Sequence, residues 1–393
     1  MTVDTSSAGD AGVGAGAEQL AIAAAVAAGE SVLSRRFGSA ITLVAPEDLA
    51  GSGPATVVRA RVVSSFALPR TLVIKHYPDR PESGADPFAQ EAVSYQLFTA
   101  LAADERMCPE LVAHDGRDRV LVLEDLGRTP TLEDKLYARD SRAAERALLS
   151  WARSLGRLHA STAGREADFN ALLRRLGGPA KGDSDDVDEL CGRVPPLIRK
   201  RLGIPVPDEV RAQVTAALDQ SRAAGFRAFS PVELSPDNNL VTGQGVRFLD
   251  FENGCVRSAL VDAAHLRLPF AGWPDALALP AGMSEAMIAA WRAEVVGVWP
   301  AFADDEVLAG HLTSSELLRV WLITGEEMGS LNLSRHAPPV SREAAFVTWW
   351  RDLARHAGYV RMAAVSEFAA RVAAALAARL GPHADLAFYP AFR

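Results

Sequence analysis

Cysteines, basic runs and long apolar segments are scarce in this sequence, and each absence excludes a class of protein. Three cysteines, Cys108, Cys191 and Cys255, are too few and too far apart for a disulfide framework or a zinc cluster. The formal net charge is −8 without a long basic run, so nucleic acid and anionic membranes are poor partners. The alanine-rich stretch LAIAAAVAA is too short to span a bilayer and lacks the basic region of a signal peptide. We therefore expect a cytoplasmic protein.

What the chain does have is length and apolar content. It has 393 residues, of which 49% are hydrophobic, and this is ample for a large core. The length favours two or three domains, or one enzyme with two lobes. Residues 1–16 are mostly small or polar and predict a disordered tail. Residues 17–37 predict a surface helix.

The part of the chain after this helix is typical of a β-sheet. Five apolar runs are rich in β-branched residues and are bounded by turn-forming residues. One helix, from about Asp86 to Leu101, follows the third run, with apolar residues at helical spacing. The five predicted strands lie in AITLVAPEDLA, ATVVRARVVS, RTLVIKHY, LVAHDG and RVLVLEDLG.

After Thr131 the pattern becomes helical, with one exception. The exception is FSPVELSPDNNLVTGQGVRFLDFENG, residues 229–254, in which two short apolar runs bracket the turn TGQG. This pattern predicts a β-hairpin. Asn238 precedes its first strand, and Asp250 stands at the end of its second strand.

The predicted order of elements is distinctive: five strands with one helix after the third, then a helical part with one hairpin. Together with the motifs LVIKHY, AQEAVSYQLF and FLDFENG, it resembles the aminoglycoside phosphotransferase branch of the protein-kinase-like fold. The motifs cover roughly residues 40–270. The resemblance implies an α+β, bilobal protein. Its N-lobe (17–126) would hold a five-stranded antiparallel sheet plus one helix, and its larger, mostly helical C-lobe (127–393) would hold the catalytic loop 229–254.

The resemblance implies nucleotide-binding residues in the N-lobe. A kinase needs a cation on the α- and β-phosphates of ATP or GTP and a carboxylate that holds this cation. Lys75 matches the family's third-strand lysine, and Glu91 matches its helical partner. Taken singly, Lys75 also fits an edge strand facing water, and Glu91 fits an ordinary solvated helix position. Backbone groups near Glu124 and Leu126 would bind the adenine edge.

The resemblance also implies a magnesium site. An amide oxygen and a carboxylate at the two rims of a hairpin suit a hard cation such as Mg²⁺. Asn238 matches the family's catalytic-loop Asn, and Asp250 matches its metal-binding Asp. The alternatives are local, because Pro-Asp-Asn is a good turn by itself and Asp250 could simply cap the strand end.

The catalytic loop departs from the family pattern. Phosphotransferases of this branch usually have His-Gly-Asp-Leu-His-Pro-Gly-Asn, whereas the same frame here is PVELSPDN. Glu233 therefore stands where the catalytic Asp is expected, and Pro231 replaces the His. A Glu can accept a proton as an Asp does. Its side chain is one methylene longer, however, and a misplacement of about an ångström can cost about 10²-fold in rate.

Two further residues match supporting positions of the family. Asp262 matches a residue that braces the catalytic loop, with a helix N-cap as the alternative. His159 matches a residue at the end of a long C-lobe helix, where we expect packing and hydrogen bonding.

The acceptor would bind between the catalytic loop and the C-terminal helices. Glu326, Glu327 and the acidic residues of segment 183–188 would suit a cationic acceptor such as an aminoglycoside, with solvated surface charge as the alternative. Trp349 and Trp350 offer either a stacking surface or part of a core helix.

The main hypothesis is an ATP-dependent phosphotransferase acting on a hydroxyl of a small molecule, aminoglycoside-like or another natural product, or of a natural-product precursor peptide. The rival is a pseudokinase that binds nucleotide or a partner protein without turnover. Glu233 and Pro231 are the residues on which the two readings differ. High Ala, Arg and Gly usage is typical of a GC-rich bacterial source, where such genes serve in resistance or biosynthesis.

Overall fold

The structure is a computed structural model in which the described residues form two compact units. The first unit comprises Met1–Arg128, Asp168–Ala180 and Asp250–Gly254, and the second comprises Thr129–Ala167, Lys181–Leu249 and Cys255–Arg393. No helix in the described part of the chain combines the length and apolarity needed to cross a membrane. The described residues are 10–50, 53–63, 68–78, 80–81, 84–178, 185–268, 270–271, 273–333 and 341–393.

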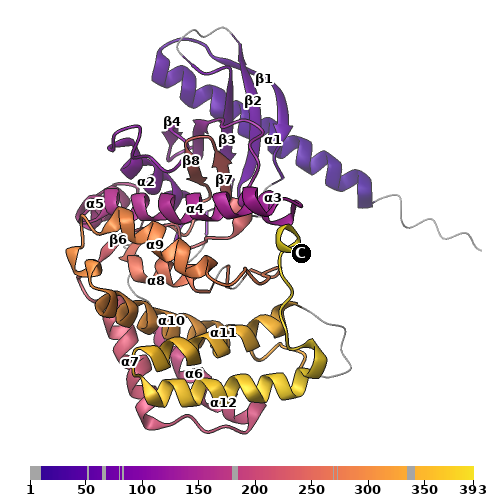
Figure 1. Cartoon of the computed structure of the whole chain (residues 1–393). Helices are drawn as coiled ribbons and strands as arrows, with labels where there is room; N and C mark the ends of the chain where they lie inside the picture. The colour runs from indigo at the N-terminus through magenta and orange to yellow at the C-terminus, as the bar shows by residue number, and fades with distance from the viewer. Residues whose placement is uncertain are drawn as a thin grey trace, which may run out of the picture. The chain divides into compact units, whose positions relative to one another are not determined.

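The first unit contains a five-stranded antiparallel sheet with the strand order β1-β2-β3-β5-β4 (Figure 1). The predicted five strands with one helix after the third are confirmed. β3 is the central strand, so its residues are paired on both sides. The strands are β1 (Thr42–Asp48), β2 (Thr56–Val63), β3 (Thr71–His76), β4 (Leu111–Asp115) and β5 (Val120–Glu124).

Two helices cover the two faces of this sheet. Side chains alternate between the faces along a strand. Leu72 and Ile74 of β3 therefore pack in a core with Ala25, Val32 and Leu33 of α1 (Asp10–Phe37). The opposite face of β3 faces α2 (Pro87–Thr99), whose N-cap residue Asp86 accepts a hydrogen bond from the Phe88 N–H. This arrangement gives Lys75 a buried neighbour on α2.

α1 begins inside the segment predicted as a disordered tail. Its first residue is Asp10, whereas the sequence predicts disorder for 1–16. The alanine-rich segment that follows is a strong helix former, and extending an existing helix needs only one further hydrogen bond per residue. Residues 1–9 lie outside the described residues.

The second unit is mostly helical, as predicted, with two small two-stranded sheets. The hairpin β7 (Asn239–Thr242) and β8 (Gly245–Phe248) confirms the pattern around TGQG. β6 (Arg227–Ser230) pairs with β9 (Cys255–Ser258). The α-helices are α3 (Leu132–Tyr137), α4 (Ser141–Thr162), α5 (Glu166–Arg175, shared with the first unit), α6 (Asp185–Leu202), α7 (Asp208–Arg222), α8 (Ala259–Ala263), α9 (Met283–Val295), α10 (Asp305–Glu327), α11 (Ser341–Tyr359) and α12 (Ala363–Leu380).

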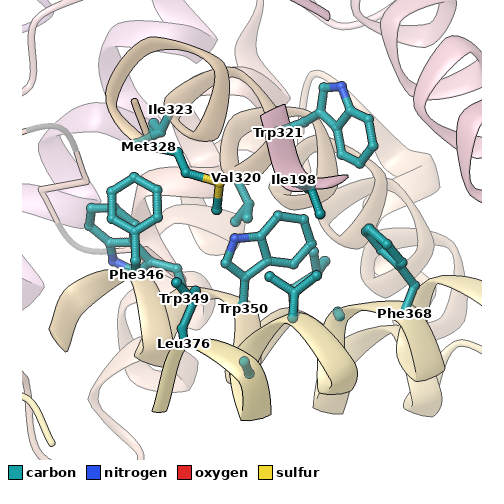
Figure 2. Close-up of a cluster of buried hydrophobic side chains, with 14 of the residues drawn as sticks. Ile198, Val320, Trp321, Ile323, Met328, Phe346, Trp349, Trp350, Phe368 and Leu376 are labelled. Atoms are coloured by element: carbon teal, nitrogen blue, oxygen red, sulfur yellow. The ribbon is translucent and has the colours of Figure 1, made fainter. Parts of the chain in front are cut away.

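The helices α6, α10, α11 and α12 share one apolar core (Figure 2). Trp350 is fully buried there, and its ring lies 6.5 Å from Trp321 and 5.8 Å from Phe368, centroid to centroid. Trp349 is 5% exposed. Both tryptophans are therefore core residues, and a stacking surface at this place is excluded.

Candidate active site

The first unit contains a buried ion-pair cluster centred on Lys75. Its Nζ donates hydrogen bonds to Glu91 Oε1 at 2.7 Å and to Asp250 Oδ1 at 2.8 Å. The Lys75 side chain is 10% exposed on a central strand, and Glu91 is fully buried. Lys75 is therefore not an edge-strand residue facing water, and Glu91 is not a solvated helix residue.

Glu91 accepts two further hydrogen bonds. The Tyr77 hydroxyl donates to Oε2, and the Phe251 N–H donates to Oε1 at 3.3 Å. Burial alone would lower the pKa of Lys75, but the charges of Glu91 and Asp250 raise it above its usual value. Burial and then the charge of Glu91 raise the pKa of Tyr77 far above its usual value. At neutral pH the cluster therefore holds a charged Lys75 beside a neutral Tyr77.

Asp250 has an uncommon backbone conformation, with φ 61°. For a residue other than glycine, this left-handed conformation costs roughly 1–2 kcal/mol. Such strained residues are common at functional sites. The Asp250 side chain is 29% exposed and contacts Lys75, which lies 175 residues away in sequence. A strand-end cap does not describe this contact, because the partner is a buried ammonium group.

Glu124 and Leu126 lie at and beyond the end of β5. The Glu124 N–H donates to Glu110 O at 2.9 Å, and its carboxylate accepts from the Glu110 N–H at 3.2 Å. The Glu124 N–H is therefore used within the sheet and is not available for adenine. The adenine-binding role of the other backbone groups near Glu124 and Leu126 stays a prediction.

In the second unit, Asn238 ends a short 3₁₀ turn (η1, Pro236–Asn238) directly before β7. Its Nδ2 donates to Ser235 Oγ at 3.3 Å, so the turn chemistry expected of Pro-Asp-Asn is present. Its backbone oxygen accepts from the Leu249 N–H at 2.9 Å, which closes the base of the hairpin. Leu249 immediately precedes Asp250 in the chain. The metal role of Asn238 stays a prediction.

The residue before Glu233 is strained. Val232 has φ 69°, which is costly for a β-branched side chain. The family pattern has Gly at this position, and Gly adopts positive φ without a steric cost. The backbone at Val232 thus has the positive φ that glycine would adopt freely, although valine disfavours it.

A buried hydrogen-bond chain supports the strained residue. The Val232 N–H donates to Ser230 Oγ at 3.0 Å, and Ser230 Oγ donates to Asp262 Oδ1 at 2.9 Å. Burial alone would raise the pKa of Asp262, but the charge of Arg257 and the hydrogen bond with His159 hold it well below its usual range. Asp262 lies inside α8 and is fully buried, so it braces the loop and is not an N-cap.

His159 connects this brace to the helical core. Its Nε2 lies 3.2 Å from Asp262 Oδ2, and its Nδ1 accepts from Trp291 Nε1 at 3.0 Å. His159 and Trp291 are both fully buried. The packing and hydrogen-bonding role predicted for His159 is confirmed.

Glu233 lies beside a cavity of about 360 Å³ within the second unit. The cavity is lined by the loop 232–235 and by α10, through Arg319, Glu326 and Glu327. Other acidic candidates for the acceptor site lie elsewhere. Asp188 pairs with Arg222 at 2.8 Å, and Asp183 is outside the described residues.

Three residues of these clusters were missed from the sequence. Tyr77 stands two positions after Lys75, so strand alternation places both side chains on one face, and that signal was available. Arg319 precedes Glu326 by two helical turns on α10, which is a weaker signal. Ser230 gives no signal, because its role depends on the pairing of β6 with β9 and on the position of α8.

A scan against protein-family models and a search of curated proteins find no match. Solved structures are similar at low identity. A choline/ethanolamine kinase family protein from Mesorhizobium loti is 16% identical, with a TM-score of 0.44, over 86% of this chain and 93% of that chain. A thermostable mutant of aminoglycoside phosphotransferase APH(4)-Ia is 15% identical, with a TM-score of 0.39, over 85% and 98%.

The amicoumacin kinase hAmiN, in complex with AMP-PNP, Ca²⁺ and Ami, is 12% identical, with a TM-score of 0.49, over 78% of this chain and 87% of that chain. The expected resemblance to aminoglycoside phosphotransferases is therefore found among solved structures. At these identities and TM-scores the similarity concerns the fold, and it says nothing of activity.

Proposed function

We propose that this protein is a phosphotransferase that moves the γ-phosphate of ATP or GTP to a hydroxyl group of a small molecule or peptide. The observation that carries the proposal is the Lys75–Glu91–Asp250 cluster. A charged lysine is held at 2.7 Å by a fully buried carboxylate and at 2.8 Å by a partly exposed one. An ion pair that only stabilised the fold would need the contact with Glu91 alone, and not the contact with Asp250.

The residues of the cluster fit a nucleotide with its magnesium ion. Lys75 supplies a fixed cation for the α- and β-phosphates. Asp250 supplies carboxylate oxygens on the exposed side of the cluster, and we assign Asn238 as the second protein ligand of the metal. Magnesium is commonly bound by one or two carboxylates plus substrate phosphates, so a magnesium site does not require a larger acidic cluster. The described residues contain no group of three or more potential metal ligands. When bound, magnesium neutralises charge on the transferred phosphoryl group.

Glu233 is proposed as the carboxylate on the acceptor side. In the transfer, the acceptor oxygen forms a bond to the γ-phosphorus, and its proton passes to Glu233. The bond from that phosphorus to the bridging oxygen breaks, and the electron pair leaves with the nucleoside diphosphate. The position of Glu233 at a cavity favours this role over the pseudokinase alternative, in which the residue would have no ligand to face.

Thermal unfolding with and without nucleotide tests the proposal. ATP or GTP with Mg²⁺ is expected to raise the Tm, since a ligand at a hundredfold excess over its Kd adds about 2.7 kcal/mol. The Asp250→Asn variant should lose most of the magnesium-dependent part of this shift. Asp385→Asn is the control, because the Asp385 side chain is 91% exposed in the second unit. No shift with either nucleotide at millimolar concentration would refute the proposal.

A further inference from the structure

The cavity beside Glu233 is lined by positively and negatively charged side chains, and their arrangement constrains the chemistry of its ligand. It lies wholly within the second unit and has a volume of about 360 Å³, in the range of small-molecule sites. Its polar lining includes Glu233, His265, Arg319, Glu326 and Glu327. The inference below rests on the proposed function, since it concerns the acceptor of that reaction.

Arg319 is a half-buried cation with few hydrogen-bond partners among the described residues. Its Nη2 donates to the backbone oxygen of Ala271 at 2.7 Å. Its Nε is buried and has no hydrogen-bond partner among the described residues, and no carboxylate of those residues lies within 4 Å of its guanidinium. Burial lowers the pKa of Arg319, and the charge of Glu326 offsets part of this effect. A guanidinium whose Nε has no hydrogen-bond partner is incompletely satisfied, and an oxygen-bearing ligand would complete it.

His265 lines the same cavity and is also incompletely bonded. It is 5% exposed, and its Nδ1 has no hydrogen-bond partner among the described residues. Burial, and then the neighbouring charge of Arg319, lowers the pKa of His265 to about 3. At neutral pH the ring is therefore uncharged, and its unbonded Nδ1 is the donor to a ligand in the tautomer that carries the hydrogen there.

No described carboxylate of the lining lies within ion-pair distance (4 Å) of Arg319, although the charge of Glu326 acts on it from farther away. Glu327 is already paired with Arg342, whose Nε lies 2.7 Å from its Oε2. Glu326 and Glu233 are exposed, whereas His265 is buried and Arg319 is half-buried. His265 and Arg319 thus offer donors and a positive charge, and the two exposed carboxylates, Glu233 and Glu326, offer acceptors.

We propose that the acceptor carries a carboxylate, which binds Arg319 and His265, in addition to the hydroxyl that faces Glu233. Arginine suits this role because its planar fork matches the two oxygens of a carboxylate. The substrate class is therefore a hydroxy acid or a hydroxyl-bearing amino acid or peptide with a free carboxylate. A purely cationic amino sugar would leave Arg319 and His265 without partners.

A matched pair of probes tests the carboxylate. N-acetyl-L-serine and N-acetyl-L-serinamide share the hydroxyl and differ in having a carboxylate or an amide. Each is titrated in the absence of nucleotide, and binding is read from the shift in Tm and from the difference in tryptophan fluorescence between the wild type and Trp273→Phe, since Trp273 lines the cavity. The acid should bind at least about tenfold more tightly than the amide, a difference of about 1.4 kcal/mol.

Three variants assign the difference to Arg319. Arg319→Gln should remove the preference for the acid, Arg319→Lys should keep part of it, and Arg371→Gln on the exposed side of α12 should keep all of it. Equal binding of acid and amide to the wild type, no binding of the acid, or an unchanged preference in Arg319→Gln would each overturn the proposal.

A third titration separates the two anions that such a site could take. If inorganic phosphate binds in an Arg319-dependent way and the acid does not, the site serves the transferred phosphoryl group, and the carboxylate proposal is overturned. None of these titrations contains nucleotide. Their failure would therefore leave the test of nucleotide binding intact, and a failure of nucleotide binding would leave them interpretable.

Discussion

Lys75 donates to Glu91 at 2.7 Å, and Glu91 has no exposed surface at all. Within the described part of the chain, Glu91 accepts its side-chain hydrogen bonds from Lys75, Tyr77 and the Phe251 N–H. Removing one partner of a buried pair leaves an uncompensated charge, which costs more than the pair itself contributes. This relationship ties the stability of the first unit to the residue proposed to bind phosphate.

Lys75→Met should therefore destabilise the protein strongly, by about 3–5 kcal/mol, because it leaves the buried Glu91 carboxyl group without its cation. The double variant Lys75→Met/Glu91→Gln should be much less destabilised than the sum of the two single variants, since neither charge remains. Urea unfolding of the four proteins measures this coupling. Additive single effects would show that the two side chains do not act as a pair.

Glu233→Gln should lower turnover by roughly 10²–10⁴-fold once an acceptor is known, the usual range for a group that accepts a proton. Nucleotide affinity should hardly change, since the nucleotide contacts are assigned to Lys75 and Asp250. Glu233→Asp is the sharper test. If the loop has adapted to the longer side chain, this substitution also loses activity, although it restores the residue usual in the family.

The matched control is Glu285→Gln, on an exposed position of α9 in the same unit, which should leave turnover unchanged. Turnover of Glu233→Gln at the level of this control would show that the Glu233 carboxylate takes no part in the reaction. The pseudokinase reading would then regain support.

The first unit shows what a sequence can predict. Alternation of apolar residues, with turn-forming residues between the runs, is enough to place all five strands and α2. The pairing of Lys75 with Glu91 follows from the family resemblance, with Glu91 on the helix after the lysine's strand, and the structure contains this contact. Tyr77 was missed, although its spacing from Lys75 places it on the same face.

The second unit shows where sequence reasoning stops. The hairpin could be predicted because its signal is local, but the support of Val232 by Ser230 and Asp262 joins positions 32 residues apart. The partial isolation of Arg319 is likewise invisible in the sequence. Whether a guanidinium has a carboxylate partner depends on how helices pack, and no spacing rule encodes that.

Val232→Gly should stabilise the protein by about 0.5–1 kcal/mol. The substitution removes a left-handed conformation that costs a side chain about 1–2 kcal/mol, and part of this gain is offset by the greater backbone entropy of Gly in the unfolded chain. Val298→Gly is the control, because Val298 is 43% exposed in a turn and is absent from the positive-φ residues. The control should lose stability, again by up to about 1 kcal/mol. Equal losses in both variants would contradict the strain.

His265 should make stability depend on pH on the acidic side of neutrality. Its pKa is about 3 in the folded protein, against about 6.5 in the unfolded chain. Above about pH 6.5 neither state binds the proton, so His265 has no effect there. As the pH falls below that value, the unfolded chain binds the proton and the folded protein does not, so stability is lost by up to about 1.4 kcal/mol per pH unit.

His265→Gln should therefore flatten the dependence of unfolding free energy on pH between about pH 6.5 and pH 4. Below about pH 4 a separate loss begins in both proteins, because the pKa of Asp262 is held below its usual range and the unfolded chain then binds that proton first. His76, His114 and His311 also have lowered pKa values, chiefly through burial, and add to the slope in both proteins. Burial raises the pKa of Glu133, Glu326 and Asp352, which opposes that slope in both proteins, so the test is the difference between the two curves. Urea unfolding at several pH values measures both slopes. Parallel curves for the wild type and His265→Gln would show that His265 takes up its proton in the folded protein as readily as in the unfolded chain, and that its ring is not the neutral donor proposed for the cavity.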